Sequence, residues 1–317
     1  MCVIIASAAW PTAAQAQNAR DYPTKPIRLL NPLPAGGPTD ILGRMIAQPM
    51  SEALGKQIVM DNRPGASGNI AAEMAAKAPA DGHTLFIAGG GNFAINVSLF
   101  SKLPYDPLRD FAPIALIATA PYIVAVHPSV RANTIKELIT LAKAKPKELN
   151  YGAVTGNAAH LANALFNTAA GIEMVHIPYK GAALATNDVI SGLIQVTFAS
   201  TPGSMPHVKS GKLKALGITS VQRASALPEL PTVAETLPGY EATVWYGLAA
   251  PAGTPNAIIR RLHSELATAV KNPALRDRMI AADYEPAVMN PEQFSAFIKS
   301  EIVKWGKAVK ISGARAD

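Results

Sequence analysis

The chain has 317 residues, enough for two domains of ordinary size. Hydrophobic residues make up 49% and charged residues only 16%, a balance typical of a globular protein that excludes a largely disordered one. The formal net charge of +7 comes from scattered basic residues with few aromatic residues, so no nucleic-acid partner is expected. The single cysteine, Cys2, excludes a disulfide framework and a cysteine-based zinc site.

The N-terminus is typical of an exported protein. Cys2 to Trp10 are small or apolar, and Ala14-Gln15-Ala16 fits the A-x-A cleavage pattern. A signal peptide over residues 1–16 is therefore predicted, and its missing basic region points to a truncated signal. The alternative is a disordered alanine-rich tail. Cleavage would leave no cysteine, which suits an oxidising compartment, so the predicted location is the periplasm or the exterior.

Beyond the N-terminus, short apolar runs alternate with helical patterns, which predicts an α/β fold with parallel strands. Strands are expected at Ile27–Leu30, Ile58–Met60, Thr84–Ala88, Ile123–Val126, Val175–Ile177, Gln195–Phe198, Ala215–Ile218 and Thr243–Leu248. Helices are expected near Asp40–Leu54, Asn69–Lys77, Thr134–Lys145, Ala158–Ala170 and Ala182–Ser191. Pro49 predicts a kink or break in the first helix. No later run approaches 18 uninterrupted apolar residues, so no membrane-spanning helix is predicted.

Two C-terminal segments carry apolar stripes at helical spacing. One stripe consists of Ile258, Leu262, Leu266 and Ala269, and the other of Phe294, Ile298, Ile302, Trp305 and Val309. Both stripes predict helices with a packing face and no chemistry of their own.

Two strand-to-helix turns of small residues are the most informative local feature. Pro34–Asp40 follows the first strand, and Gly152–Asn157 precedes the helix that contains His160. A helix start leaves backbone N–H groups without partners and carries partial positive charge, and glycine allows close approach of a ligand. The two turns therefore predict a carboxylate or phosphate held between two lobes without a buried lysine or arginine. The alternative is an ordinary connection capped by Thr39 or Asn157.

Motifs for catalysis and cofactor binding are absent from the sequence. No HExxH pair and no G-x-S-x-G elbow is present, and neither turn matches a dinucleotide or P-loop pattern. His160 is either a general base or a local packing or capping group, and its place at a helix start favours the second interpretation. Gly89–Asn92, after another strand, is either a further wall of the site or a flexible loop. No metal and no cofactor is expected.

Seven short segments in order carry a family resemblance: Pro34–Asp40, Asn62–Asn69, Asp81–Leu85, Pro178–Gly181, Ser210–Leu213, Pro228–Glu235 and Pro251–Pro255. With these segments, the chain from about Tyr22 to the C-terminus resembles the solute-binding receptors of tripartite tricarboxylate transporters, the Bug family of periplasmic proteins. The resemblance implies a type II periplasmic binding protein fold, or Venus flytrap, in which two α/β lobes joined by two crossing strands close on a ligand.

The resemblance also implies where the lobes divide. The crossings are expected near Pro121–Val126 and Leu216–Ser220. Lobe 1 would be discontinuous, comprising residues 22–122 plus 219–317, and lobe 2 would comprise residues 123–218.

The ligand-binding residues that the resemblance implies are mostly backbone groups of the two turns. They are Pro34, Ala35, Gly36, Gly37, Thr39 and Asp40 of the first turn, Ala153, Val154, Thr155, Gly156, Asn157 and His160 of the second, and Gly90, Asn92, Tyr179, Lys180, Ser200 and Thr201 around them. Asp40 is expected to order its turn, because its charge favours the helix start. Lys180 is either a partner for a distal carboxylate or a solvated lysine.

Three departures from the family pattern remove polarity from the expected cleft. Leu33 stands where an aromatic residue is frequent, Ala153 where a serine is usual, and Ala199 where an aspartate is common. The second turn is also one residue shorter. An aromatic or longer-chain carboxylate is therefore expected to fit better than citrate or aspartate.

The predicted function is that of a non-enzymatic, monomeric receptor that captures a small carboxylate and delivers it to the membrane permease of a tripartite transporter. Two alternatives stay open. In one, the ligand-bound form docks on a sensor kinase of a two-component system. In the other, the chain is an enzyme for an anionic substrate, with His160 or Lys180 as its acid/base group.

Overall fold

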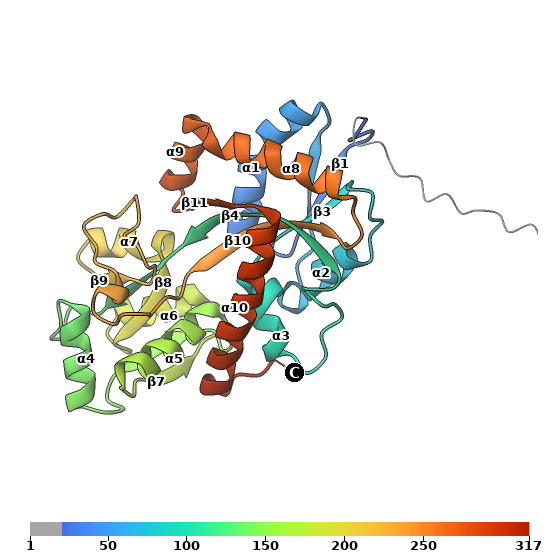
Figure 1. The fold of residues 1–317 in the computed structure, drawn as a ribbon. Coiled ribbons are helices and arrows are strands. Elements are labelled where there is room, and N and C mark those ends of the chain that lie inside the picture. The colour runs from blue at the N-terminus through green and yellow to red at the C-terminus, as the bar shows by residue number, and fades with distance from the viewer. Residues whose placement is uncertain (1–20, 317) are drawn as a thin grey trace, which may run out of the picture.

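The structure is a computed structural model that describes residues 21–316, so the predicted signal peptide lies outside the described residues. Its strands form two sheets (Figure 1). The six-stranded sheet contains, in spatial order, β11 (Glu285–Met289), β4 (Phe111–Ala120), β10 (Val244–Pro251), β3 (Thr84–Gly89), β1 (Ile27–Asn31) and β2 (Ile58–Asn62). The five-stranded sheet contains β7 (Val175–Pro178), β6 (Asn150–Ala153), β8 (Val196–Ser200), β5 (Tyr122–Val126) and β9 (Lys214–Ile218).

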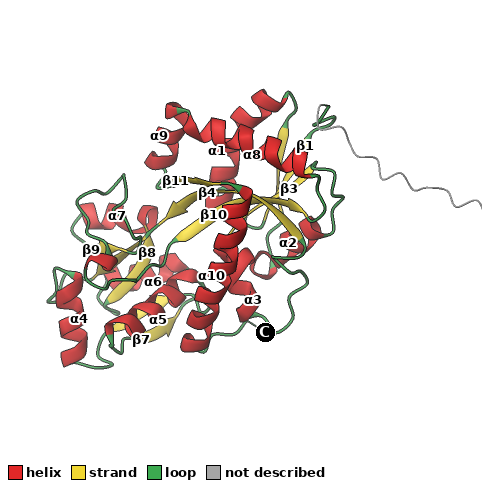
Figure 2. Cartoon of the chain, in the orientation of Figure 1, coloured by secondary structure: helices red, strands yellow, loops and turns green. Residues whose placement is uncertain are grey.

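Helices cover the sheets (Figure 2). Around the six-stranded sheet lie α1 (Pro38–Leu54), α2 (Asn69–Ala76), α3 (Asn96–Leu99), α8 (Asn256–Lys271), α9 (Pro273–Ala281) and α10 (Pro291–Ser312). Around the five-stranded sheet lie α4 (Ile135–Ala144), α5 (Ala158–Ala170), α6 (Ala182–Ile190) and α7 (Thr201–Lys209). Short helical turns occur at Ala66–Gly68, Gly91–Ile95 and Val233–Glu235. No described helix is both long and apolar enough to cross a membrane.

Strand direction follows the predicted parallel layout only in part. β1 pairs in parallel with β2 and β3, and β6 pairs in parallel with β7 and β8. In contrast, β10 is antiparallel to β3 and β4, and β5 is antiparallel to β8 and β9. β11, at the edge of the six-stranded sheet, is also antiparallel to β4.

The chain passes between the sheets twice, and the two passages lie side by side. The first runs from β4 through Pro121 into β5, and the second leaves β9 at Thr219. Tyr122 and Thr219 join them, because Thr219 N–H donates to Tyr122 O at 3.0 Å and Tyr122 N–H donates to Thr219 Oγ1 at 2.8 Å. These positions agree with the expected crossings, while the lobe boundaries themselves stay a prediction.

Both faces of the six-stranded sheet bury apolar side chains, because successive residues of a strand alternate between faces. Leu29 belongs to the core under α1 and α8, whereas the next residue, Leu30, belongs to the core under α2 and α10. The core under α10 continues without interruption into the second sheet, where it includes Phe166 and Phe198. The two sheets therefore share one apolar core on the α10 side.

A buried acid anchors α10 to this core. Glu301 is 3% exposed and accepts hydrogen bonds from Trp245 Nε1 at 2.7 Å and Trp305 Nε1 at 2.8 Å. Lys304 forms ion pairs of 2.5 Å with Glu301 and with Glu241. Because Glu241 and Trp245 belong to the segment that returns from the second sheet, α10 is tied to the second passage. In Figure 1, α10 runs past α3 and α5, which it contacts.

Several sequence predictions are confirmed and others are wrong. Both apolar stripes lie on the C-terminal helices, buried except for the partly exposed Ile302. The predicted break at Pro49 is wrong, because α1 continues through it and buries Ile46 and Met50 on either side. β4, β11 and α7 were not predicted, because Pro113, Pro286 and Pro206 interrupt their patterns. β11 lies at the sheet edge, where proline is tolerated.

Replacing Gly247 by alanine tests the close packing of β10 against α10. An added Cβ would lie 2.1 Å from Phe294 Cζ, and Phe294 is fully buried against Phe93 and Trp245, so the ring has no room to withdraw. We expect Gly247→Ala to lower the free energy of unfolding by about 3 kcal/mol in urea denaturation. Gly91→Ala is the control, because its Cβ meets nothing within 4 Å. Equal midpoints for the two variants would contradict this packing.

Candidate ligand-binding site

The first predicted turn is a β-turn from Pro34 to Gly37, closed by a 3.1 Å hydrogen bond from Gly37 N–H to Pro34 O. Gly36 has a φ of +79°, a left-handed value that favours glycine. Its N–H donates to Asp40 Oδ2 at 2.9 Å, four residues along the chain in the first turn of α1. The turn and the helix start are thus held together by one side chain.

Asp40 is a buried and fully engaged carboxylate. It also accepts hydrogen bonds from Arg44 Nε and Asn62 Nδ2, each at 3.0 Å. Burial alone would raise the pKa of Asp40, but the hydrogen bonds from Arg44, the Gly36 amide and Asn62 outweigh it and hold this pKa below its ordinary value. Asp40 therefore stays charged and orders the turn.

The second predicted turn repeats this geometry in the other sheet. Asn157 N–H donates to Val154 O at 3.1 Å, and Gly156 also has a φ of +79°. The Gly156 N–H donates at 3.1 Å to Nδ1 of His160, again four residues along and in the first helical turn. The Asn157 side chain caps α5 by accepting from His160 N–H at 2.8 Å.

His160 is held neutral by its surroundings. Its ring is 3% exposed and stacks on His176, with ring centroids 3.9 Å apart. Burial and the nearby His176 lower the pKa of His160 to about 4, and burial lowers the pKa of His176 as well. Because Nδ1 accepts from Gly156, the ring carries its proton on Nε2. His160 therefore orders its turn as a packed capping group.

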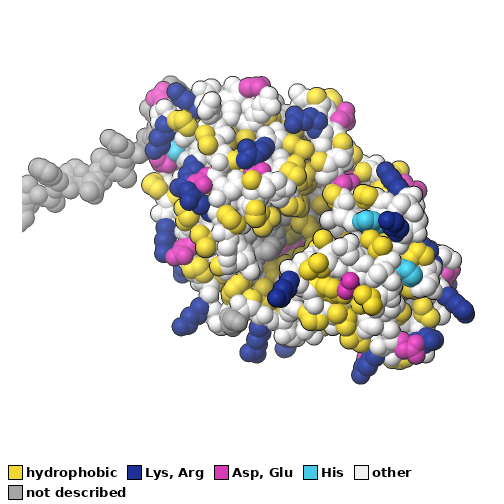
Figure 3. All heavy atoms as spheres, turned by 180° about the vertical axis from the view of Figure 1, so that it is seen from behind, with side chains coloured by type: hydrophobic (Ala, Val, Ile, Leu, Met, Phe, Trp, Pro, Cys, Tyr) yellow, Lys and Arg dark blue, Asp and Glu magenta, His cyan; other side chains and the backbone are white. Residues whose placement is uncertain are grey.

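Between the sheets the surface is hollowed, and the hollow is lined mainly by hydrophobic and uncharged side chains (Figure 3). Two cavities that share Tyr122 and Ser200 lie here. The inter-sheet cavity, of about 250 Å³, is lined by Gly36, Pro38, Ile41, Ala120, Pro121, Tyr122, Ser200, Thr201, Pro202, Val244, Tyr246, Ala282, Asp283 and Tyr284. The α5 cavity, of about 200 Å³, is lined by Tyr122, Gly152, Ala153, Asn157, Ala159, Ala182, Ala185, Thr186, Thr197, Phe198, Ala199 and Ser200.

Four helix N-termini meet these two cavities. They are the starts of α1 at Pro38, α5 at Ala158, α6 at Ala182 and α7 at Thr201. No lysine or arginine of the described chain lines either cavity. Any positive potential in the hollow therefore comes from backbone N–H groups and helix dipoles, which suit a carboxylate.

A family model described as "Tripartite tricarboxylate transporter family receptor" matches residues 42–313. Protein BugT of Bordetella pertussis is 33% identical over 301 residues, which cover 94% of this chain and 92% of BugT. A solved structure of R. palustris Rpa4515 with adipate is 36% identical with a TM-score of 0.79, covering 93% of this chain and all of that one. MatC of Rhodopseudomonas palustris, with bound malate, is 28% identical with a TM-score of 0.73, covering 91% of this chain and all of MatC.

The chain belongs to the tripartite tricarboxylate transporter receptor family. The predicted family and the periplasmic binding protein fold are thereby confirmed. Members of this family are periplasmic solute-binding receptors, so the enzyme alternative is wrong.

The structure brings part of the predicted site together. Gly36, Ala153, Asn157, Ser200 and Thr201 line the two cavities. The other predicted residues of the two turns lie beside them in the chain and line neither of these two cavities; they are Pro34, Ala35, Gly37, Thr39, Asp40, Val154, Thr155, Gly156 and His160. Their part in ligand binding stays a prediction.

Four other predicted residues of this receptor, Gly90, Asn92, Tyr179 and Lys180, do not line either cavity. Gly90 packs on Trp245, and Asn92 Nδ2 donates to Ser67 O at 3.2 Å, which holds a neighbouring loop. The Tyr179 hydroxyl donates to Asp188 Oδ2 at 2.6 Å, and Lys180 is exposed. This placement favours the solvated interpretation of Lys180.

The sequence interpretation missed several cavity residues. Tyr122, Val244 and Tyr246 lie at the two passages between the sheets, and Asp283 and Tyr284 follow α9. Their only sequence signal was proximity to the expected crossings, and nothing local marked residues 282–284.

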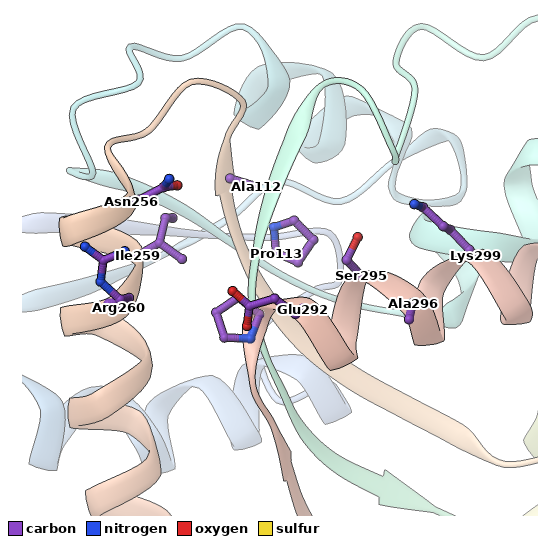
Figure 4. A pocket seen from close by; sticks show the side chains of 10 residues that line it. Ala112, Pro113, Asn256, Ile259, Arg260, Glu292, Ser295, Ala296 and Lys299 are labelled. Carbon is purple, nitrogen blue, oxygen red and sulfur yellow. The ribbon is translucent and has the colours of Figure 1, made fainter.

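A larger cavity, of about 500 Å³, lies between the starts of α8 and α10 and the first residues of β4 (Figure 4). Charged side chains at its walls include Arg260, Glu292 and Lys299. Because neither glycine turn lines it, this cavity is separate from the candidate ligand-binding site of the receptor.

The low pKa of His160 predicts a pH-dependent stability. In the folded receptor this pKa is about 4, below the ordinary value of about 6.5, so the unfolded chain binds more protons between these pH values. The free energy of unfolding should therefore fall as the pH drops from about 6.5 to about 4. Urea denaturation should show a smaller fall in His160→Gln, which keeps an acceptor for Gly156.

His207→Gln, on α7, is the matched control and should retain the pH dependence of the unchanged chain. Asp40 does not confuse the measurement, because its lowered pKa places its own loss of stability at more acidic pH. An unchanged slope in His160→Gln would contradict the assignment.

Proposed function

We propose that this receptor captures a small carboxylate between its two sheets and delivers it to the permease of a tripartite transporter. The observation that carries the proposal is the repeated turn: in both sheets a left-handed glycine is bonded to a side chain four residues later, directly before a helix that starts at the hollow. Helix starts of this kind favour anions. The relatives with adipate and with malate support the ligand class.

Closure of two lobes would complete the site. Residues 22–122 plus 219–317 would form one lobe and residues 123–218 the other, each contributing one glycine turn. Closure would remove water from around the bound carboxylate and so strengthen its charge-assisted hydrogen bonds to the turns. Delivery in the periplasm fits the family and the predicted signal peptide.

The ligand should have an apolar body. Ile41, Pro202 and Val244 line the inter-sheet cavity, and Ala153 and Ala199 line the α5 cavity. These walls offer contact area and few hydrogen bonds, so they suit an aromatic or alkyl carboxylate better than a hydroxylated tricarboxylate.

A thermal-shift comparison of carboxylates with their amides tests the proposed function. The full chain should first be unfolded and refolded to remove any bound ligand. A carboxylate at 100 times its Kd should then add about 2.7 kcal/mol of stability, which raises Tm by several degrees. The matched amide, which lacks the charge, should give no shift. Equal shifts from acid and amide, or none from either, would contradict anion capture.

Replacing Ala153 by serine tests the apolar character of the α5 cavity. Ala153 is 3% exposed and lines this cavity, so the new hydroxyl would face the ligand. We expect Ala153→Ser to shift the affinity ratio of malate to hexanoate about fivefold toward malate, because one added hydrogen bond contributes about 1 kcal/mol. Calorimetric titration measures the ratio, and Ala144→Ser, on the exposed side of α4, is the control. An unchanged ligand preference would count against the interpretation.

A further inference from the structure

Among the described residues that line the inter-sheet cavity, Asp283 is the only charged one. It lies just beyond α9, which ends at Ala281, and its φ is +64°. Left-handed residues after a helix are usually glycine or asparagine. A carboxylate at this end of a helix also lies next to carbonyl groups with partial negative charge, where a cation would be favoured. The local backbone therefore disfavours an aspartate here on two counts.

The Asp283 carboxylate has no hydrogen-bond partner among the described residues to offset this. No hydrogen bond or ion pair engages it within the described part of the chain. Its surroundings remove water from it, and burial raises its pKa; Lys209 of α7 acts in the opposite direction and Glu285 of β11 in the same one. A half-buried carboxylate without a hydrogen bond is costly, and a cation from outside the chain would relieve that cost.

Tyrosine rings surround the same cavity. Tyr246 and Tyr284 meet edge to face with ring centroids 5.5 Å apart, and Tyr122 lines the wall formed by the other sheet. The Tyr284 hydroxyl donates to Pro38 O at 2.7 Å, which ties the residues after α9 to the start of α1. Aromatic faces attract cations, and the attraction strengthens where water is excluded.

The two ends of the cavity have opposite electrostatic character. The starts of α1 and α7, at Pro38 and Thr201, are helix N-termini and suit an anion. Ala282 and Asp283, after the C-terminus of α9, suit a cation. The cavity volume is about 250 Å³, which corresponds to about eight water molecules in the liquid. This is room for a short chain between two charged groups.

We propose that the ligand is an amino-carboxylate whose ammonium group, at the end far from the carboxylate, binds at Asp283 among the three tyrosines. This inference rests on the proposed capture of a carboxylate by the glycine turns. It excludes a dicarboxylate as the preferred ligand, because neither cavity offers a lysine or arginine to a second carboxylate and Asp283 repels it.

Two chain-matched series of ligands test the inference in calorimetric titrations of the full chain. The first is hexanoate, 6-aminohexanoate and adipate, and the second is 4-methylbenzoate, 4-(aminomethyl)benzoate and terephthalate. In at least one series the ammonium compound should bind at least about tenfold more tightly than the methyl compound, with the dicarboxylate weakest. Asp283→Asn should remove this preference, so that the ammonium and methyl compounds of a series bind about equally tightly.

Asp283→Asn is expected to fold, because asparagine tolerates the left-handed conformation. Asp277→Asn, an exposed aspartate of α9, removes the same charge away from the cavity and should behave like the unchanged chain. Binding of the methyl compounds without an ammonium preference, or a preference that survives Asp283→Asn, would overturn the inference while the proposed function stands. Absence of binding by every carboxylate would overturn both. A lower Tm in Asp283→Asn with an unchanged preference would mean that Asp283 serves only as a distant partner of Lys209.

Discussion

The hydrogen bond between a left-handed glycine and the side chain four residues later is the interaction on which the candidate ligand-binding site depends. It occurs as Gly36 to Asp40 in one sheet and as Gly156 to His160 in the other. In each case it fixes how the chain leaves a strand and enters a helix, so the first helical turn starts at the hollow. Backbone amides arranged in this way need no rearrangement to receive an anion. A site of this kind requires no cationic side chain.

The two turns share a geometry but differ in charge. Asp40 stays ionised and offsets part of the positive end of α1, whereas His160 stays neutral and leaves the positive end of α5 without an acid in its first turn. The stronger positive end therefore belongs to the five-stranded side, next to the small and apolar walls of the α5 cavity. The inter-sheet cavity has the larger aromatic walls and its own acid, Asp283. One half of the hollow thus favours negative charge more than the other.

The sequence predicted the features whose causes are local. Glycine directly before a helix start marked both turns, and helical spacing marked α8 and α10, because backbone conformation and helix packing depend on residues that are neighbours in the sequence. The wall formed by Tyr246, Asp283 and Tyr284 depends on how β10 and the segment after α9 pack against α1. This packing is between residues far apart in the sequence, so no local pattern predicts it. Gly90 and Asn92 follow a strand, as a binding loop does. Gly90 packs on Trp245 and Asn92 holds the loop at Ser67, while their part in ligand binding stays a prediction.

The position of the shared core decides where the hollow can open. On the α10 side the two sheets are joined by continuous apolar packing and by Glu301, which holds both Trp245 and Trp305. Separation there would expose buried aromatic side chains and leave a buried carboxylate without its donors, which is costly. On the hollow side, the walls of the inter-sheet cavity meet across the pair of passages held by Tyr122 and Thr219. A motion between the sheets that keeps this packing intact would pivot near α10 and these passages, and it would widen or narrow the hollow while the core stays closed.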